Sequence, residues 1–285
     1  MPTATPARRG SRQAPSQRRG ARPRARTAKQ EREEPTSLEA EPVEIIVEQL
    51  SSFNESKNIM IYGPSGQGKT VLAGGAPNAI YLSTEKGVVA AKRAGSKAEL
   101  IRAPDWEHAL SGVVWADKNL GPGDWLIIDS ETKMQILYLR WLLRTHHELN
   151  SRRDLDIPAI QDHQKWQNAF MRWTDHIVDA PYNSIFICTS MVTEDQEGET
   201  LVLPSIRGKG YEISNYISAQ MDVILYYAVS ERASTDEMTI RRALAQPYPP
   251  YLAKDRYSAL GKRWDVEEGD YTAMAEMIRA IEKVA

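Results

Sequence analysis

The segment at residues 63–70 constrains the fold of this chain more than any other feature. It reads GPSGQGKT and fits the pattern G-x-x-x-x-G-K-[ST], which needs a strand before it and a helix after it. The apolar run at residues 59–62 supplies the strand, and residues 71–73 are a plausible helix start. The sequence therefore predicts a strand–loop–helix unit that binds phosphate. The alternative is a glycine-rich turn before a helix that has no ligand.

The chemistry of this loop follows from its residue types. Glycines allow backbone N–H groups to turn inward around phosphate oxygens, and the start of the helix adds a positive dipole end. We expect Lys69 to neutralise the β- and γ-phosphates of ATP and the Thr70 hydroxyl to bind Mg²⁺. The nucleotide is expected to contact the whole loop, which comprises Gly63, Pro64, Ser65, Gly66, Gln67, Gly68, Lys69 and Thr70.

Continuous apolar runs separated by helical patterns predict the fold class. Such runs suit parallel strands that are covered on both faces. We expect buried strands at residues 59–62, 79–83, 125–129, 184–189 and 222–229, and late antiparallel edge strands at residues 238–245 and 251–254. The prediction is an α/β fold with a mostly parallel sheet flanked by helices, over residues 46–285.

Charge divides the chain into two parts. Residues 1–30 carry nine basic and no acidic residues, so the remainder has a net charge of −11. Residues 1–45 are poor in large apolar side chains, and we expect a disordered arm, first basic and then acidic. The basic part suits either nucleic-acid binding by counterion release or a solubilising tail.

Other features of the composition limit the class of protein. The single cysteine, Cys188, excludes an internal disulfide framework and a cysteine-built zinc site. The chain contains no apolar run of membrane-spanning length, so no membrane partner is expected. We expect a cytoplasmic protein, located in the host cell if the gene is carried by a phage.

Two acidic residues follow predicted strands. Asp129 ends the run WLIID, where a carboxylate is expected to help hold Mg²⁺; the alternative is a helix N-cap. Glu85 lies just beyond the second strand, at the edge of the sheet where ligands bind. We expect Glu85 to orient and deprotonate the water that attacks the γ-phosphate. The alternative is an acidic residue that stabilises the first turn of the next helix.

Taken in order, the segments GPSGQGKT, YLSTEKG, WLIIDS and FICTS resemble the RecA-like ATPase core. More narrowly, the chain resembles the phage-encoded RecA-like ATPases, a group that includes single-strand annealing proteins of phage recombination. The resemblance covers residues 57–260 and includes the segments at residues 157–178, 203–210 and 253–256. It implies that Glu85 is the catalytic base and that Asp129 serves the metal. It also implies ATP hydrolysis, binding of single-stranded DNA, a homo-oligomer and a single-strand binding protein as a candidate partner.

The resemblance assigns expectations to the segment after the fourth strand. Thr189 and Ser190 stand where RecA-like proteins usually place Gln or His to sense the γ-phosphate. Residues 191–220 are expected to form a long polar connection. Its Arg207, Lys209 and Tyr211 would face DNA, and the alternative is a solvated loop tip.

A final pair of basic residues lies near the end of the resemblance. Lys254 and Arg256 resemble residues that reach an ATP bound by a neighbouring subunit; the alternative is a charged edge strand. Two rival functions remain open for the whole chain. One is a phosphotransferase that acts on a small molecule, and the other is a nucleotide-dependent switch or scaffold with little turnover.

Overall fold

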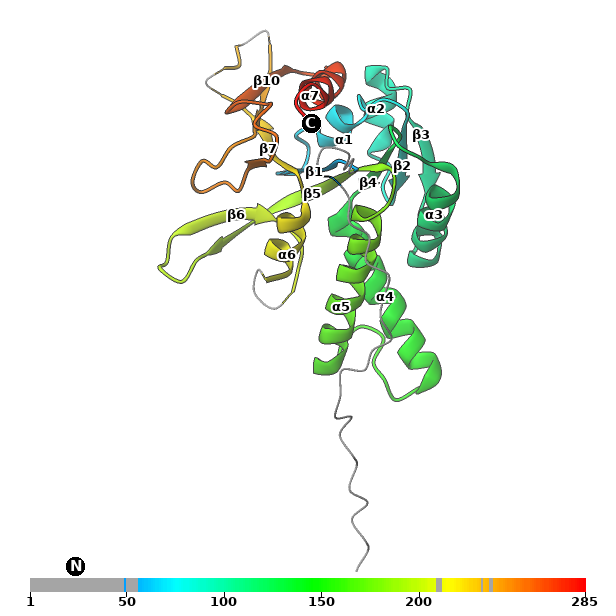
Figure 1. Cartoon of the computed structure of the whole chain (residues 1–285). Coiled ribbons are helices and arrows are strands. Elements are labelled where there is room, and N and C mark those ends of the chain that lie inside the picture. The colour runs from blue at the N-terminus through cyan, green and yellow to red at the C-terminus, as the bar shows by residue number, and fades with distance from the viewer. Residues whose placement is uncertain (1–48, 50–55, 209–211, 232, 236–237) are drawn as a thin grey trace, which may run out of the picture. The chain divides into compact units, whose positions relative to one another are not determined.

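The computed structural model describes residues 49, 56–208, 212–231, 233–235 and 238–285 (Figure 1). The chain divides into two units, Met1–Ser52 and Phe53–Ala285, and the second unit holds the elements described below. The expected arm at residues 1–45 lies outside the described residues.

A ten-stranded sheet with the order β10-β8-β7-β1-β5-β4-β2-β3 organises this unit, with β6 paired to β5 and β9 paired to β7. The parallel strands are β1 (Asn58–Gly63), β2 (Ala79–Ser83), β3 (Glu99–Arg102), β4 (Trp125–Asp129), β5 (Asn183–Glu194) and β7 (Val223–Val229). The antiparallel strands are β6 (Thr200–Pro204), β8 (Ile240–Leu244), β9 (Lys254–Asp255) and β10 (Arg263–Glu267). The expected parallel sheet with late antiparallel edge strands is confirmed.

Helices cover both faces of the central strands, and Figure 1 shows α1, α2 and α7 above the sheet and α4, α5 and α6 below it. In β1, Ile59 and Ile61 pack with α1 and α7, whereas Met60 and Tyr62 belong to the core formed with α3 to α6. This double coverage explains why the strand is continuously apolar. The helices are α1 (Lys69–Ala73), α2 (Val88–Ala94), α3 (Trp106–Asn119), α4 (Glu131–Leu149), α5 (Ile160–Val178), α6 (Glu212–Gln220) and α7 (Thr272–Glu282).

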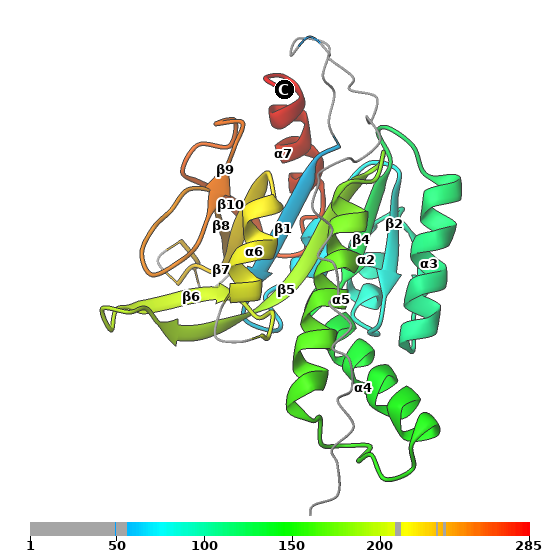
Figure 2. The ribbon, with the colours of Figure 1, turned by 60° about the horizontal axis from the view of Figure 1, so that its bottom comes forward.

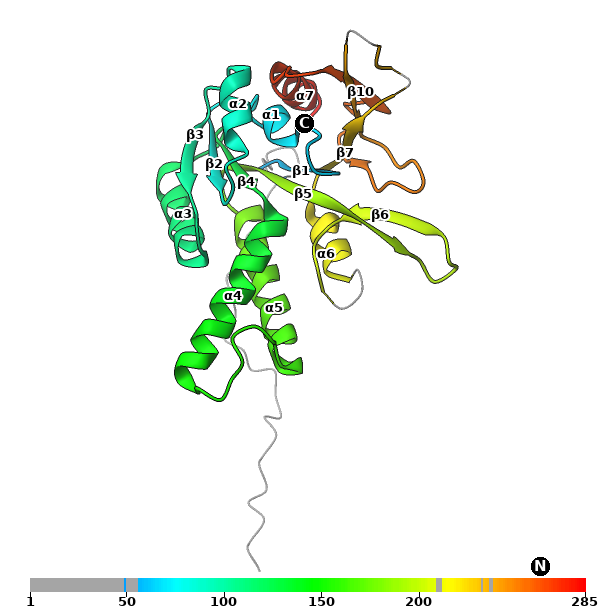
Figure 3. The same cartoon turned by 180° about the vertical axis from the view of Figure 1, so that it is seen from behind.

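The long polar connection expected at residues 191–220 is wrong. Strand β5 continues to Glu194, turns, and pairs antiparallel with β6, and α6 begins at Glu212. The turn closes through Asp195, whose carboxylate accepts from the backbone N–H of Glu199 at 2.8 Å. Val202 and Leu203 of β6 are buried, so half of the hairpin packs on the core although its polar residues suggest a loop. Figures 2 and 3 show this hairpin extending from the sheet.

Among the residues that the structure describes, no helix combines the length and the apolar character that crossing a bilayer requires.

Candidate functional site

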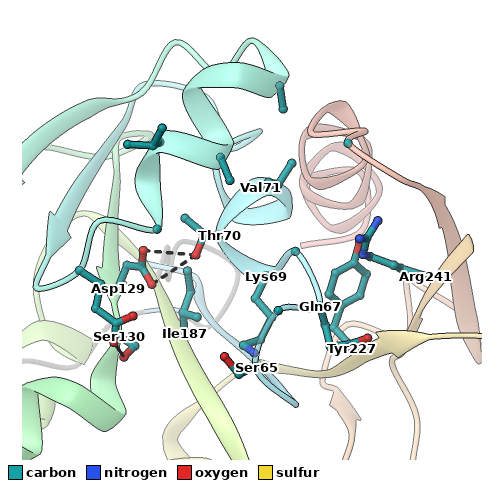
Figure 4. Close-up of a pocket in the computed structure, with 18 of the residues that line it drawn as sticks. Ser65, Gln67, Lys69, Thr70, Val71, Asp129, Ser130, Ile187, Tyr227 and Arg241 are labelled. Atoms are coloured by element: carbon teal, nitrogen blue, oxygen red, sulfur yellow. Dashed lines mark hydrogen bonds between the residues drawn. The ribbon is translucent and has the colours of Figure 1, made fainter. Parts of the chain in front are cut away.

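A cavity of about 720 Å³ lies at the carboxyl ends of β1, β2 and β4 and beside residues 187–189 of β5. Loop residues 65–70 line it, Gly63 and Pro64 are not among its described lining residues, and β5 separates β1 from β4 in the sheet. Parallel strands bring their carboxyl ends to one edge, so the segments that follow them meet there. Figure 4 shows the side chains that line the cavity.

The loop leaves β1 through a glycine that no other residue can replace. A Cβ atom added to Gly63 would lie 2.1 Å from the carbonyl oxygen of Tyr227 on the adjacent strand β7. The loop then turns at Gly66 and Gly68, whose φ angles of 80° and 84° favour glycine. On the same side, Gln67 Oε1 accepts from the backbone N–H of Val229 at 2.6 Å. The loop is therefore tied to β7 at both of these points.

The ammonium of Lys69 is held inside the loop. Its Nζ donates to the carbonyl oxygens of Gly63 and Pro64 at 2.9 and 2.6 Å. Burial lowers the pKa of Lys69, and the nearby carboxylates of Asp129 and Glu85 oppose this effect. The cation is placed at the base of the loop, where a phosphate group can meet it.

Thr70 and Asp129 come together from different elements, the first turn of α1 and the end of β4. Thr70 Oγ1 lies 3.4 and 3.3 Å from the two carboxylate oxygens of Asp129. Tyr81 holds the backbone of Thr70 through a 2.6 Å bond to its carbonyl. Burial and the neighbouring Glu85 raise the pKa of Asp129 to about 6.

These donors fit Mg²⁺. The ion prefers hard oxygen ligands and is usually held by one or two carboxylates together with substrate phosphates. A hydroxyl and a buried carboxylate supply that donor set, and a bound cation would favour the ionised form that burial disfavours. Asp129 and Thr70 are the residues that would hold it.

Glu85 lies across the cavity from the loop, after β2. It is exposed to the cavity, and its Oε1 accepts from Ser130 Oγ at 3.3 Å. The two alternatives to catalytic roles, a helix N-cap for Asp129 and a carboxylate in the first helical turn for Glu85, do not describe these residues well. The first turn of α2 contains no acidic residue, and Ser130 is the N-cap of α4 but makes no side-chain capping bond.

The middle of β5 contributes one of the two expected sensor residues to the cavity. Thr189 lines the cavity, and its backbone N–H donates to Thr132 Oγ1 at 3.2 Å. Ser190 instead pairs with Pro204 in the β5–β6 hairpin and is not among the described residues that line the cavity.

The sequence reasoning missed a cation on the far side of the loop. Arg241 of β8 lines the cavity and is 9% exposed, and its Nη2 donates to Glu268 at 2.8 Å. A Cβ atom on Gly68 would lie 3.2 Å from Arg241 Nε, so the guanidinium lies against the loop. Within the described part of the chain, Nε has no hydrogen-bond partner. Figure 4 shows Arg241 beside Tyr227, on the other side of Lys69 from Asp129.

The remaining expected residues lie away from the cavity. Lys254 begins β9 and Arg256 follows it; β9 pairs with the beginning of β7, at the opposite edge of the parallel strands. Lys254 Nζ donates to the carbonyl of Ala219 at 2.9 Å, and Arg256 donates to Asp222 at 2.6 Å. An isolated chain therefore does not bring them to its own loop.

The residues expected to face DNA are described only in part. Arg207 is exposed after β6, and its backbone is held by Gln135 through bonds of 2.8 and 2.7 Å. Lys209 and Tyr211 lie outside the described residues. Within the ranges that the structure describes, no cluster of His, Cys, Asp and Glu forms a further metal site.

Comparison with known proteins tests the interpretation of this cavity. No curated protein matches the chain. A family model described as an AAA domain matches residues 55–257, which span the phosphate loop, the parallel sheet and the β5–β6 hairpin. The match covers more than half of the chain and agrees with the loop geometry. The chain therefore belongs to this AAA domain family and carries a nucleotide-binding P-loop ATPase domain.

Proposed function

We propose that this protein hydrolyses ATP with Mg²⁺ and couples hydrolysis to single-stranded DNA in phage-type recombination or replication. The convergence of Lys69, Thr70, Asp129 and Glu85 on one cavity is the observation that carries the catalytic part of this proposal. Lys69 and Thr70 stand at the junction of the loop and α1, Asp129 ends β4, and Glu85 follows β2. The fold therefore brings these side chains together.

The binding step uses the loop. Backbone N–H groups after Gly66 and Gly68 surround the β-phosphate, and Lys69 leaves its two carbonyl partners to contact the β- and γ-phosphates. Thr70 and Asp129 hold Mg²⁺, which when bound offsets negative charge on the phosphate oxygens. Arg241 adds a second buried cation on the other side of the loop.

The hydrolytic step uses Glu85 as the base. Its carboxylate accepts a proton from water, the water oxygen attacks the γ-phosphorus, and the bond to the β–γ bridging oxygen breaks to release ADP. The Ser130 hydroxyl, 3.3 Å from Glu85 Oε1, orients the carboxylate as a positioning residue. Thr189 lines the cavity, which supports the sensor interpretation for this residue.

The DNA part of the proposal rests on the resemblance to RecA-like phage ATPases. Exposed Arg207 supports it, since an accessible cation can contact a phosphate backbone. The distance of Lys254 and Arg256 from the loop of their own chain supports a role across a subunit boundary in a homo-oligomer. A single-strand binding protein is the further candidate partner, and the host cytoplasm is the compartment.

ATP turnover measured with and without single-stranded DNA tests the proposal. Stimulation by DNA is the expected result. Turnover only with a small acceptor would indicate a phosphotransferase instead. Tight ATP binding without turnover under all conditions would indicate a nucleotide-dependent switch or scaffold.

A further inference from the structure

We propose that a face of the sheet edge formed by β7, β8 and β10 stacks the bases of single-stranded nucleic acid. The inference rests on the proposed function, because it supplies a second contact for the DNA. It concerns residues to which the resemblance assigns no role, and they lie on the sheet and the turn after β8 rather than in the segment after β6.

The two faces of this sheet edge differ in burial. On one face, Tyr227, Ala243 and Val266 are buried in the core formed with α7. On the opposite face, Tyr226, Leu244 and Arg263 form one row across the three strands and are only partly buried or exposed. Ala228, Arg242 and Asp265 form the next row. Strand geometry therefore directs alternate residues to this second face.

Three tyrosines line a pocket of about 520 Å³ on this face. Tyr226 and Tyr251 stack with ring centroids 4.0 Å apart, and Tyr248 lines the same pocket and is 66% exposed. The turn at residues 248–251 presents Tyr248 and Tyr251 together, through a 2.9 Å backbone bond between them. A large exposed tyrosine beside a stacked pair provides flat surfaces to which another planar ring can be added.

The positive charge of the pocket favours an anionic ligand. Its described lining contains three cations, Arg242, Lys262 and Arg263, and no carboxylate. Asp265 pairs with Arg242 through bonds of 2.6 and 2.8 Å, whereas Lys262 and Arg263 are exposed. Residues 31–285 have a net charge of −11, so a basic pocket is a local exception on an acidic body.

A single-stranded nucleic acid combines planar rings with phosphates, and it is the occupant to which we commit. Base–aromatic stacking beside cations is the common mode of sequence-tolerant single-strand binding, and sheets can present the aromatic rings. A proline-rich peptide can also fill an aromatic groove, but it carries no charge that would use the cations.

The pocket shares its strands with the nucleotide cavity. Along β7, Tyr226 lines this pocket and Tyr227 lines the nucleotide cavity; along β8, Arg242 and Arg241 divide in the same way. Neighbouring residues of two strands therefore face the two sites from opposite sides of one sheet. A displacement of β7 or β8 would therefore move residues that line both sites.

The test measures binding of a fluorescent oligothymidine by the full chain across a salt series. Tyr248→Ala should weaken binding about fivefold to 100-fold, the usual effect of removing a stacked aromatic ring. Lys262→Ala should reduce the slope of log affinity against log salt by about 0.7. Matched controls are Trp115→Ala and Lys118→Ala on α3, at the other end of the sheet, which should leave both quantities unchanged.

An abasic oligonucleotide of equal length separates stacking from charge. The unmodified protein should bind it more weakly than oligothymidine, and Tyr248→Ala should bind both with similar affinity. DNA-free ATP turnover should be unchanged in every pocket variant, which shows that each variant is folded.

The outcomes distinguish this inference from the proposed function. DNA binding that is identical in the unmodified protein, Tyr248→Ala and Lys262→Ala overturns the pocket and leaves the DNA function standing. No DNA binding by the unmodified protein overturns both. Binding of a proline-rich peptide that is lost in Tyr248→Ala, with DNA binding unchanged, replaces the nucleic acid by a peptide.

Discussion

Thr70 Oγ1 lies within 3.4 Å of both carboxylate oxygens of Asp129, although 59 residues separate the two in the chain. One residue belongs to the phosphate loop and the other ends a buried strand. Their contact brings the two donors proposed to hold Mg²⁺ to one position from two segments, in a sheet that places β5 between β1 and β4.

Replacing Asp129 with Asn should raise the Mg²⁺ concentration needed for half-maximal turnover by about 10- to 100-fold, as losses of supporting metal contacts do. The carboxylate charge is lost while its size and its neighbour Thr70 are kept. ATP turnover measured across a Mg²⁺ series checks this. Asp156→Asn, at an exposed position, is the control, and equal Mg²⁺ dependence of the two variants would contradict the assignment.

Mg²⁺ dependence should also change with pH. Because the pKa of Asp129 is raised to about 6, its carboxylate becomes protonated as the pH falls below that value. The apparent Mg²⁺ affinity of the unmodified protein should therefore decrease below about pH 6 and reach a plateau above pH 7. In Asp129→Asn this dependence should disappear. A profile that persists in the variant would assign the titration to another group.

Glu85→Gln should retain ATP affinity and lower turnover by about 10²-fold or more, the usual size of a general-base effect. The amide keeps an oxygen that can accept from Ser130. Lys69→Ala should instead weaken both binding and turnover. Equilibrium binding of a fluorescent ATP analogue, together with single-turnover hydrolysis, separates the two cases. Unchanged turnover in Glu85→Gln would leave the residue without a catalytic role.

Arg241→Met should weaken nucleotide binding about 10- to 100-fold, because a buried cation beside Gly68 is removed while an unbranched apolar stem is kept. The control is Arg242→Met, one residue further along β8 on the opposite face of the sheet, which should leave nucleotide affinity unchanged in the absence of DNA. Titration of ATP followed by fluorescence provides the measurement. Equal loss in both variants would indicate damage to β8 rather than a nucleotide contact.

The stability of the fold should decrease as the pH rises toward 8. Glu131 is fully buried, and burial raises its pKa from 4.5 to about 8, although Thr174 donates to it at 2.9 Å. The folded state therefore holds a proton that the unfolded state releases above about pH 4.5. This stabilisation is complete below pH 4.5 and is lost as the pH rises through 8, with a slope of up to about 1.4 kcal/mol per pH unit.

Glu131→Gln should reduce this slope. Urea unfolding at pH 7, 7.5 and 8 measures it in a range where Asp129 is mostly ionised in the folded state. The exposed Glu276→Gln on α7 should behave like the unmodified protein. A variant with the original slope would show that Glu131 does not determine it.

Lys254→Ala should lower turnover only if subunits meet, because Lys254 lies far from the loop of its own chain. Mixing this variant with Glu85→Gln should partly restore activity at hybrid boundaries, where one partner supplies Lys254 and the other supplies Glu85. Turnover of the mixture is compared with each variant alone and with the size of the assembly on a sizing column. A monomer without restoration would remove the role across subunits.

The sequence predicts the parts of this fold in which local pattern and burial agree. The apolar runs of β1, β2, β4, β5 and β7 can be recognised in the sequence because both faces of these strands are covered. The motif at residues 63–70 predicts the strand before it and the helix after it. Strand β3 is not visible, since it lies at the sheet edge and three of its four residues are exposed. The hairpin after Thr189 reads as a loop because polar residues occupy its solvent side.

The residues of the candidate site could likewise be predicted only where a local sequence pattern positions them. Glu85 and Asp129 follow predicted strands, so their meeting at one edge follows from sheet geometry. Arg241 follows no strand end and belongs to no motif; it reaches the loop only because β8 pairs with β7, a long-range contact. The tyrosines at positions 226, 248 and 251 come together for the same reason.

The continuity of β5 has a mechanical consequence. The strand touches the nucleotide cavity at Thr189 and runs without a break to Glu194, a span of roughly 17 Å at the usual rise per strand residue. Its partner β6 stiffens it along that length. Under the sensor role proposed for Thr189, the hairpin would act as a stiff arm with its base at the nucleotide cavity. A small tilt at Thr189 would then become a larger displacement at the tip of the hairpin.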